Sequence, residues 1–311
     1  MIFKNLRIVF MGTPDFAVAA LDALLQVGCN IVGVVTAPDK PAGRGMQLTE
    51  SAVKKYATKK GLHILQPEKL KNEAFLQELK ALQADIQVVV AFRMLPELVW
   101  NMPPRGTINV HGSLLPQYRG AAPINWAIIN GEKETGVTTF MLQHAIDTGD
   151  ILLQQSMSIN EDDTVGNVHD KMKIIGAEIL VKTIKGLAEK TIEEKAQATI
   201  NYELSTIKHA PKIFTETCII DWNKTTEEIH NLIRGLSPYP TAFTTLNNKK
   251  LKVFNSSKEI IAHQHQTGLV FTDNKNYLKF SCGNGFIHML DIQLEGKKRL
   301  LIKDFLKGYR A

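Results

Sequence analysis

Two polar side chains stand two residues apart at the end of an apolar run. The stretch from Ile108 to Ile128 reads INVHGSLLPQYRGAAPINWAI, in which Asn109 and His111 alternate with apolar residues. Alternate residues of a strand point to the same face of a sheet. A carboxamide can donate a hydrogen bond to a developing oxyanion, and an imidazole can move a proton near neutral pH. The pair is therefore suited to addition at a carbonyl group.

Asp147 is a third candidate. It lies in the segment QHAIDTGDILLQ, in a glycine-containing turn just before an apolar run. A carboxylate close to an imidazole fixes its tautomer and stabilises its charged form. The sequence shows no obvious Ser or Cys nucleophile, so the nucleophile is expected to belong to a substrate. It also shows no metal-ligand spacing, so we expect no metal. Taken alone, Asn-x-His is more often a structural hydrogen-bonded pair, and Asp-Thr-Gly is a common turn.

The elements that must position these residues alternate in type. Apolar runs of strand length fall at Leu6–Met11, Ile31–Val35, His63–Leu65, Asp85–Phe92, Thr107–His111, Gly136–Met141 and Ile151–Ser156. Helical patterns fall at Pro14–Val27, Glu50–Lys60, Glu73–Leu82 and Val165–Lys190. This alternation predicts an α/β fold with a doubly wound, mainly parallel, Rossmann-like sheet. Ligands bind beyond the carboxyl ends of strands in such sheets, which is where Asn109 and His111 stand.

The pattern changes after the long helix. A polar, weakly patterned stretch predicts a linker at 190–207, between a first domain at 1–189 and a second at 208–311. Short β-like runs follow at Thr217–Asp221, Ala242–Leu246, Leu251–Phe254, Gly268–Phe271, Leu278–Ser281 and Gly285–Leu290. With one helix at Thr226–Leu236, they predict a small, OB-like β-barrel.

Composition limits the class of protein. The 311 residues are 44% hydrophobic and 22% charged, which is typical of a globular chain. This length exceeds the roughly 250–300 residues that one core supports, so two domains are expected. No apolar run reaches the roughly 18 residues of a membrane span, so we expect no membrane partner. Cys29, Cys218 and Cys282 lie far apart, which favours a reducing, cytoplasmic location and gives no metal framework.

The positive charge is concentrated in the C-terminal third. From Lys208 to Ala311, 13 Lys and 3 Arg stand against 9 acidic residues, a net of +7. The first 207 residues carry 21 basic and 22 acidic side chains, a net of −1. A basic module beside a neutral one favours a polyanionic partner. On charge alone, a solvated basic surface is an equal alternative.

A resemblance adds to these patterns. The segment that holds Asn109 and His111 resembles the signature of the formyltetrahydrofolate-dependent formyltransferases, and the resemblance extends over essentially the whole chain. It implies that Asn109, His111 and Asp147 are the catalytic residues. It also implies a folate-binding segment that consists of Ser113, Leu114, Leu115 and Pro116. The family transfers the formyl group of 10-formyltetrahydrofolate to an amine.

Within the family, the chain is most similar to members whose acceptor is initiator methionyl-tRNA. The segments VFMGTPDFAVAALDALL, PDKPAGRG and RGAAPI carry this similarity. It implies that the loop Pro38–Leu48 engages the tRNA acceptor end, with Lys40 and Arg44 as contacts. Two prolines and two glycines within Pro38–Leu48 predict an irregular loop, and composition alone favours a mobile surface excursion. We further expect a monomer.

One segment departs from the family, and several rival functions remain open. Phe92-Arg93-Met94-Leu95-Pro96 replaces an aromatic-Gly-x-x-Leu-Pro run at the expected rim of the folate pocket. A nicotinamide oxidoreductase is disfavoured because the turn after Gly12 lacks the second glycine of a dinucleotide site. A binding-only tRNA module leaves the trio of polar residues unexplained. A formyltetrahydrofolate hydrolase or a glycinamide ribonucleotide formyltransferase shares the trio.

Overall fold

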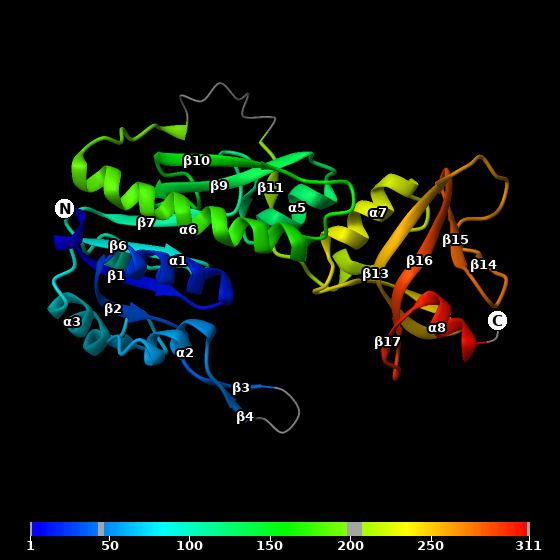
Figure 1. Ribbon diagram of the computed structural model, residues 1–311, viewed down its shortest axis with the longest axis horizontal. Coiled ribbons are helices and arrows are strands. Elements are labelled where there is room, and N and C mark those ends of the chain that lie inside the picture. Colours follow the sequence, from blue (N-terminus) through cyan, green and yellow to red (C-terminus); the bar gives the residue numbers. More distant parts are fainter. Residues whose placement is uncertain (1, 43–46, 198–206, 310–311) are drawn as a thin grey trace. The chain divides into compact units, whose positions relative to one another are not determined.

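The protein forms two compact units in a computed structural model that describes residues 2–42, 47–197 and 207–309 (Figure 1). The first unit consists of Met1–Arg119, Gly136–Ser156 and Asp170–Lys208. The second consists of Gly120–Thr135, Met157–His169 and His209–Ala311, so it takes two segments from before residue 170 as well as the C-terminal third of the chain. The expected domains at 1–189 and 208–311, joined by a linker at 190–207, stay a prediction.

A seven-stranded sheet forms the first unit, in the order β10-β9-β7-β6-β1-β2-β5. Its strands are β1 (Arg7–Gly12), β2 (Asn30–Val35), β5 (Ile64–Leu65), β6 (Ile86–Val90), β7 (Thr107–His111), β9 (Glu134–Met141) and β10 (Ile151–Ser158). The five strands from β7 to β5 run parallel, and β9 returns antiparallel to β7. The predicted Rossmann-like sheet is confirmed. The strand order reverses at β1, so the carboxyl ends of β1 and β6 flank a switch point where such folds bind ligands.

Helices cover both faces of this sheet. They are α1 (Asp15–Gln26), α2 (Ala52–Lys59), α3 (Glu73–Ala81), α4 (Glu97–Trp100) and α6 (Val165–Glu189). A Cβ on Gly176 of α6 would stand 3.5 Å from both Phe16 of α1 and Val110 of β7, so Val110 faces these two helices. Asn109 pairs in register with Val89, which packs in a cluster with Phe75 of α3 on the other face. Asn109 and His111 therefore share the α3 face of β7.

A short hairpin corrects the expected irregular loop. β3 (Lys40–Ala42) and β4 (Gln47–Thr49) pair antiparallel, with Pro41 opposite Leu48. A two-stranded ribbon tolerates proline because each strand has an outer edge without a partner. Arg44 lies outside the described residues.

The second unit is built on a six-stranded antiparallel sheet, which is visibly curled in Figure 1. Its strands are β12 (Ala242–Leu246), β13 (Lys249–Ile260), β14 (Val270–Thr272), β15 (Leu278–Cys282), β16 (Gly285–Leu294) and β17 (Arg299–Leu301). The other elements of this part are α5 (Pro123–Ile129), α7 (Thr226–Gly235), α8 (Ile302–Lys307) and the two-residue strand β11 (His209–Ala210). β11 pairs with β8 (Arg119–Gly120), whose first residue belongs to the first unit. The expected small barrel-like β-domain is confirmed, as a half-barrel.

One expected strand of this domain is wrong. Within Thr217–Asp221, the residues up to Cys218 belong to a 3-10 turn at Glu216–Cys218, and Ile219 alone bridges to Phe243 of β12. The run is apolar because Cys218 and Ile220 pack into the core of this domain beside Ile229 of α7. Core packing without ladder pairing gives the same sequence pattern as a strand.

A hydrophobic helix of the length needed to span a bilayer is absent from the described ranges. The same ranges contain no group of three His, Cys, Asp or Glu side chains placed to hold a metal ion. The three cysteines are free and buried, and burial raises the pKa of the Cys29 thiol to about 11.

Candidate active site

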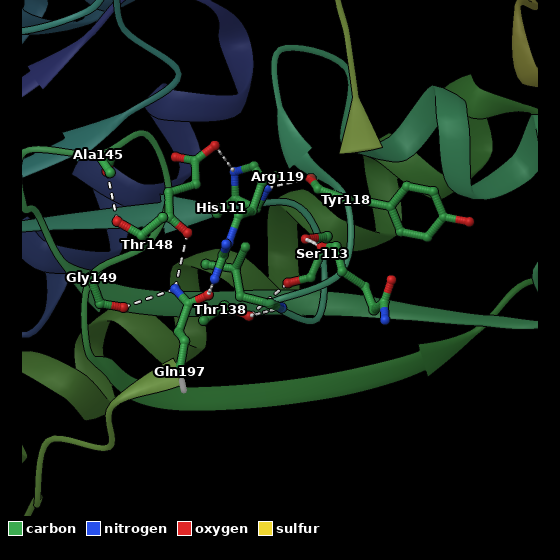
Figure 2. Close-up of polar contacts among 12 residues, drawn as sticks. His111, Ser113, Tyr118, Arg119, Thr138, Ala145, Thr148, Gly149 and Gln197 are labelled. Carbon is green, nitrogen blue, oxygen red and sulfur yellow. Dashed lines mark hydrogen bonds and ion pairs between the residues drawn. The ribbon is translucent and has the colours of Figure 1, made fainter. Parts of the chain in front are cut away.

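His111 ends β7 and is almost completely buried. Its ring packs edge-on against Phe140 of the neighbouring strand, with 6.4 Å between the ring centroids. The Nε2 atom lies 2.9 Å from the carbonyl oxygen of Tyr118 (Figure 2). A carbonyl only accepts, so Nε2 carries a hydrogen and donates it. Neutral His111 therefore keeps its basic lone pair on Nδ1.

Asp147 faces that basic nitrogen. Its Oδ2 atom lies 3.9 Å from His111 Nδ1, and both side chains are about nine-tenths buried. This separation is too long for a direct hydrogen bond, yet it is within ion-pair distance of a protonated ring. The structure thus brings together His111 and Asp147, which are 36 positions apart in the sequence. A water or a substrate atom can bridge such a gap.

Asn109 stands one pleat before His111 on the same face of β7. It is half-buried, between Val89 of β6 and Phe140 of β9 in register. Among the described residues, its carboxamide has no hydrogen-bonding partner. A partly buried, polar side chain of this kind at a strand end is suited to holding a polar ligand atom.

The turn that carries Asp147 has a special backbone. Asp147 has a φ of +54°, in the left-handed region that Asp tolerates better than most residues. A Cβ on Gly149 would lie 1.6 Å from the carbonyl oxygen of Met141, so only glycine fits there. Thr148 Oγ1 donates to the carbonyl oxygen of Ala145 across the turn, at 3.0 Å. The Asp-x-Gly pattern is therefore also a requirement of the backbone.

Arg119 and Gln197 join the site, although the sequence pattern did not single them out. Gln197 Oε1 accepts hydrogen bonds from Arg119 Nε at 3.1 Å and from Nη2 at 2.6 Å (Figure 2). Gln197 Nε2 donates to the carbonyl oxygens of Asp147 and Gly149. Burial lowers the pKa of Arg119, and the charge of Asp147 acts in the opposite direction. No local pattern marks Gln197, because its partner turn lies 48–50 positions away in the sequence.

The predicted folate-binding segment forms a tight turn after β7. The Ser113 hydroxyl donates to the carbonyl oxygen of Gln117 at 2.6 Å, and Leu115 packs with Phe140 in a small core cluster. Pro116 is buried and Leu114 is half-buried. Most of these side chains therefore shape the turn itself, and their contact with folate stays a prediction.

The segment that departs from the family lines a hollow of about 510 Å³. Its lining consists of Leu70, Lys71 and residues 93–98. Arg93 donates to the carbonyl oxygens of Pro67 and Glu68, so its guanidinium fixes the preceding loop. Of the predicted tRNA contacts, Lys40 is exposed on β3, and Arg44 lies outside the described residues.

Comparison with known families identifies the family of this chain. Residues 6–184 match the model of the formyl transferase family, and residues 212–310 match that of the formyl transferase C-terminal domain. Two solved structures share the fold, and their low sequence identities indicate the fold alone. One is WlaRD, a sugar 3N-formyl transferase, with a TM-score of 0.69 and 23% identity, and the match covers 94% of this chain and 99% of that chain. The other is an N-formyltransferase from Helicobacter canadensis, with a TM-score of 0.66 and 21% identity, and the match covers 91% of this chain and 98% of that chain.

Sequence relatives are much more similar. The methionyl-tRNA formyltransferase of Bacteroides thetaiotaomicron is 52% identical over 312 residues, which cover 99% of this chain and 97% of that protein. That of Flavobacterium johnsoniae is 47% identical over 309 residues, which cover 98% and 96%. These two relatives are methionyl-tRNA formyltransferases, and the chain belongs to the formyl transferase family.

Proposed function

We propose that this protein transfers the formyl group of 10-formyltetrahydrofolate to the α-amino group of methionine on initiator methionyl-tRNA. The observation that supports this most strongly is the meeting of His111, Asp147 and Asn109 at one sheet edge, in a chain about half identical to relatives named for this reaction. Asn109, His111 and Asp147 act as the catalytic residues.

Asn109 acts on the formyl oxygen. When the methionine nitrogen attacks the formyl carbon, a C–N bond forms and the carbonyl electron pair moves onto oxygen. The Asn109 carboxamide is not engaged by a described residue, so its N–H can donate to that oxyanion. A preorganised donor of this kind is typically worth about 10²–10³ in rate.

His111 moves the proton through Nδ1. The lone pair of Nδ1 accepts the proton that the attacking nitrogen must lose, because Nε2–H is held by Tyr118. Asp147 stabilises the resulting imidazolium across 3.9 Å. The Nδ1–H then donates to the folate nitrogen as the C–N bond to the donor breaks, which returns His111 to its neutral form.

Folate is expected at the same edge of the sheet. The hollow beside the β6 end combines the apolar side chains of Leu70, Met94 and Leu95 with the cation of Lys71. Flat rings suit apolar walls, and the carboxylates of a glutamate tail suit a cation. We expect the turn at residues 113–116 to contact the folate as well, and no residue of the site is assigned to a metal.

The acceptor is held by basic residues in this proposal. The C-terminal domain supplies general tRNA affinity through its net charge of +7, and Lys40 and Arg44 of the segment Pro38–Leu48 contact the acceptor end. A monomeric state and a cytoplasmic location stay predictions.

One assay tests the proposal. The purified protein is incubated with 10-formyltetrahydrofolate and charged initiator tRNA, and the esterified amino acid is analysed for formylmethionine. We expect formylmethionine with wild type and a large loss with His111→Ala. Formate release that does not need the tRNA would identify a hydrolase instead. Binding of tRNA without any formyl transfer would identify a binding module.

A further inference from the structure

The turn that carries Asp147 is held by one buried side chain. Gln197 Nε2 donates to the carbonyl oxygen of Asp147 at 3.0 Å and to that of Gly149 at 2.8 Å (Figure 2). Gln197 is 5% exposed. Both amide hydrogens therefore hold the backbone on either side of Thr148, away from competing water.

The other end of the Gln197 amide is fixed as well. Its oxygen accepts two hydrogen bonds from Arg119, a residue that only donates. Carbonyl oxygens only accept, so the amide has one possible orientation and its full hydrogen-bonding capacity is used. A side chain in this state is rigid, and it transmits its position to whatever it holds.

These contacts close a circuit around the catalytic pair. Arg119 directly follows Tyr118, whose carbonyl oxygen accepts from His111 Nε2. Gln197 connects Arg119 to the Asp147 turn, and the Asp147 carboxylate faces His111 Nδ1. The imidazole and the carboxylate are thus placed by one hydrogen-bonded frame.

The backbone brings Gln197 to this place. Lys195 forms an antiparallel bridge with Ile151 at the start of β10, with hydrogen bonds of 2.8 and 2.9 Å. Gln197 lies two residues after Lys195, and Gly149 lies two residues before Ile151. In an antiparallel pair, these two positions face each other.

We propose that Gln197 is a positioning residue which, together with Arg119, sets the Asp147 carboxylate at its working distance from His111. This inference rests on the proposed function, in which Asp147 stabilises the protonated ring. Without Gln197, two carbonyl oxygens would be deprived of their buried donor, and a turn with a left-handed Asp147 would have less to hold it. A displacement of about 1 Å at a catalytic group can cost about a hundredfold in rate.

Two substitutions separate the possible roles of this side chain. Gln197→Leu removes all four hydrogen bonds, whereas Gln197→Glu keeps acceptors for Arg119 and removes the donor to the turn. We expect both to lower kcat by about a hundredfold, while KM for 10-formyltetrahydrofolate changes by less than about threefold. Near wild-type kcat in Gln197→Glu would overturn the proposal.

Gln87→Leu is the matched control. Gln87 is a glutamine of the same sheet, 1% exposed, whose Oε1 accepts from Thr107 at 3.2 Å. We expect it to lower the melting temperature as Gln197→Leu does, but to leave kcat within about threefold of wild type. If kcat falls in proportion to the melting temperature in both Gln197→Leu and Gln87→Leu, Gln197 has only a structural role.

A double-mutant cycle tests whether Gln197 acts through Asp147. In an Asp147→Asn background, Gln197→Leu should reduce kcat by less than about threefold further, because the group that it positions is already absent. A second loss of about a hundredfold would show that Gln197 acts elsewhere.

Hydrogen exchange separates this proposal from the proposed function. In Gln197→Leu, the backbone amides of residues 143–150 should exchange faster than in wild type and in Gln87→Leu. If wild type fails to formylate methionyl-tRNA but this exchange pattern is found, the proposed function fails and the structural frame stands. Unchanged exchange in residues 143–150 would overturn the positioning role whatever the acceptor is.

Discussion

At the scale of single residues, the site separates the two nitrogens of His111. Nε2–H is held by the carbonyl oxygen of Tyr118, so proton exchange is confined to Nδ1, the nitrogen that faces Asp147. Tyr118 itself has a φ of +60°, an uncommon conformation for a tyrosine. Such backbone conformations are concentrated at functional sites, where surrounding packing maintains them. Nδ1 must therefore both accept the proton of the attacking amine and donate a proton to the leaving nitrogen.

The first prediction concerns this pair. His111→Ala and Asp147→Ala should each lower kcat by about 10²–10⁴-fold, because the proton-transfer group or its charge partner is removed. Steady-state formylation of charged tRNA measures the effect. His63→Ala is the control, since His63 is half-exposed and pairs with Glu78 away from the site. Near-normal kcat in His111→Ala or in Asp147→Ala would remove the substituted residue from the mechanism.

The second prediction concerns Asn109. Asn109→Ala should lower kcat by about 10²–10³-fold if its carboxamide is the main donor to the oxyanion. The donor acts in the transition state, so kcat should fall and KM for 10-formyltetrahydrofolate should change little. Asn255→Ala, an exposed substitution on β13, is the control. A change confined to KM would instead make Asn109 a residue that binds the ground state.

The sequence could indicate this trio because each member stands at a strand end beside a recognisable pattern. Asn109 and His111 alternate on one strand, and Asp147 precedes a glycine in a turn. Gln197 could not be found in this way. It lies in a polar, weakly patterned stretch, and its role depends on a bridge between Lys195 and Ile151 that forms only in the fold.

At the scale of elements, the strands buried on both faces were the most predictable. β6 consists of five buried residues in sequence, and a β-branched run of this kind is typical of a central parallel strand. The β3–β4 hairpin was missed because proline and glycine indicate irregular structure. The helix α5 was missed because Pro123 reads as a turn, although proline also suits the first position of a helix.

The third prediction concerns the start of α7. The Thr225 side chain accepts from the backbone of Glu228, and the Glu228 carboxylate accepts from the backbone of Thr225, which together form a capping box. Thr225→Ala should lower the free energy of unfolding by about 1 kcal/mol. Denaturant unfolding measures this cost. Thr215→Ala is the control and should have little effect, because the Thr215 side chain makes no capping hydrogen bond in wild type. An unchanged midpoint in Thr225→Ala would contradict the assignment.

The capping box also predicts a pH dependence. Hydrogen bonds from Thr225 lower the pKa of Glu228 below its ordinary value of 4.5. A carboxyl group with a lowered pKa stabilises the fold above its unfolded pKa, and this contribution is lost as pH falls through the folded pKa. Thr225→Ala removes the hydroxyl bond to this carboxylate but keeps the backbone one, so the difference between wild type and Thr225→Ala should be largest at pH 7 and only partly reduced near pH 3.

At the scale of the whole molecule, charge and chemistry are carried by different parts of the chain. The proposed catalytic residues belong to the first 207 residues, whose net charge is −1, whereas Lys208–Ala311 carries +7. Part of this positive charge is gathered at one end of the C-terminal sheet. Leu251 of β13 pairs with Leu294 of the antiparallel strand β16, so the start of β13 and the end of β16 are adjacent. Three exposed lysines lie at this end: Lys249 at the start of β13, and Lys297 and Lys298 in the turn after β16.

The last prediction tests whether this basic end binds tRNA. Changing Lys249, Lys297 and Lys298 together to Gln should weaken tRNA binding, because the phosphates that these side chains neutralise would keep their counterions. Plots of log Kd against log salt should become shallower by roughly 0.7–0.9 for each phosphate that is no longer neutralised. A second triple variant, at the exposed positions Lys4, Lys59 and Lys80, removes the same charge from the first unit. It should leave Kd and its salt dependence nearly unchanged. If both triple variants weaken binding equally, net charge alone attracts the tRNA, and the basic end of the C-terminal sheet is not its binding surface.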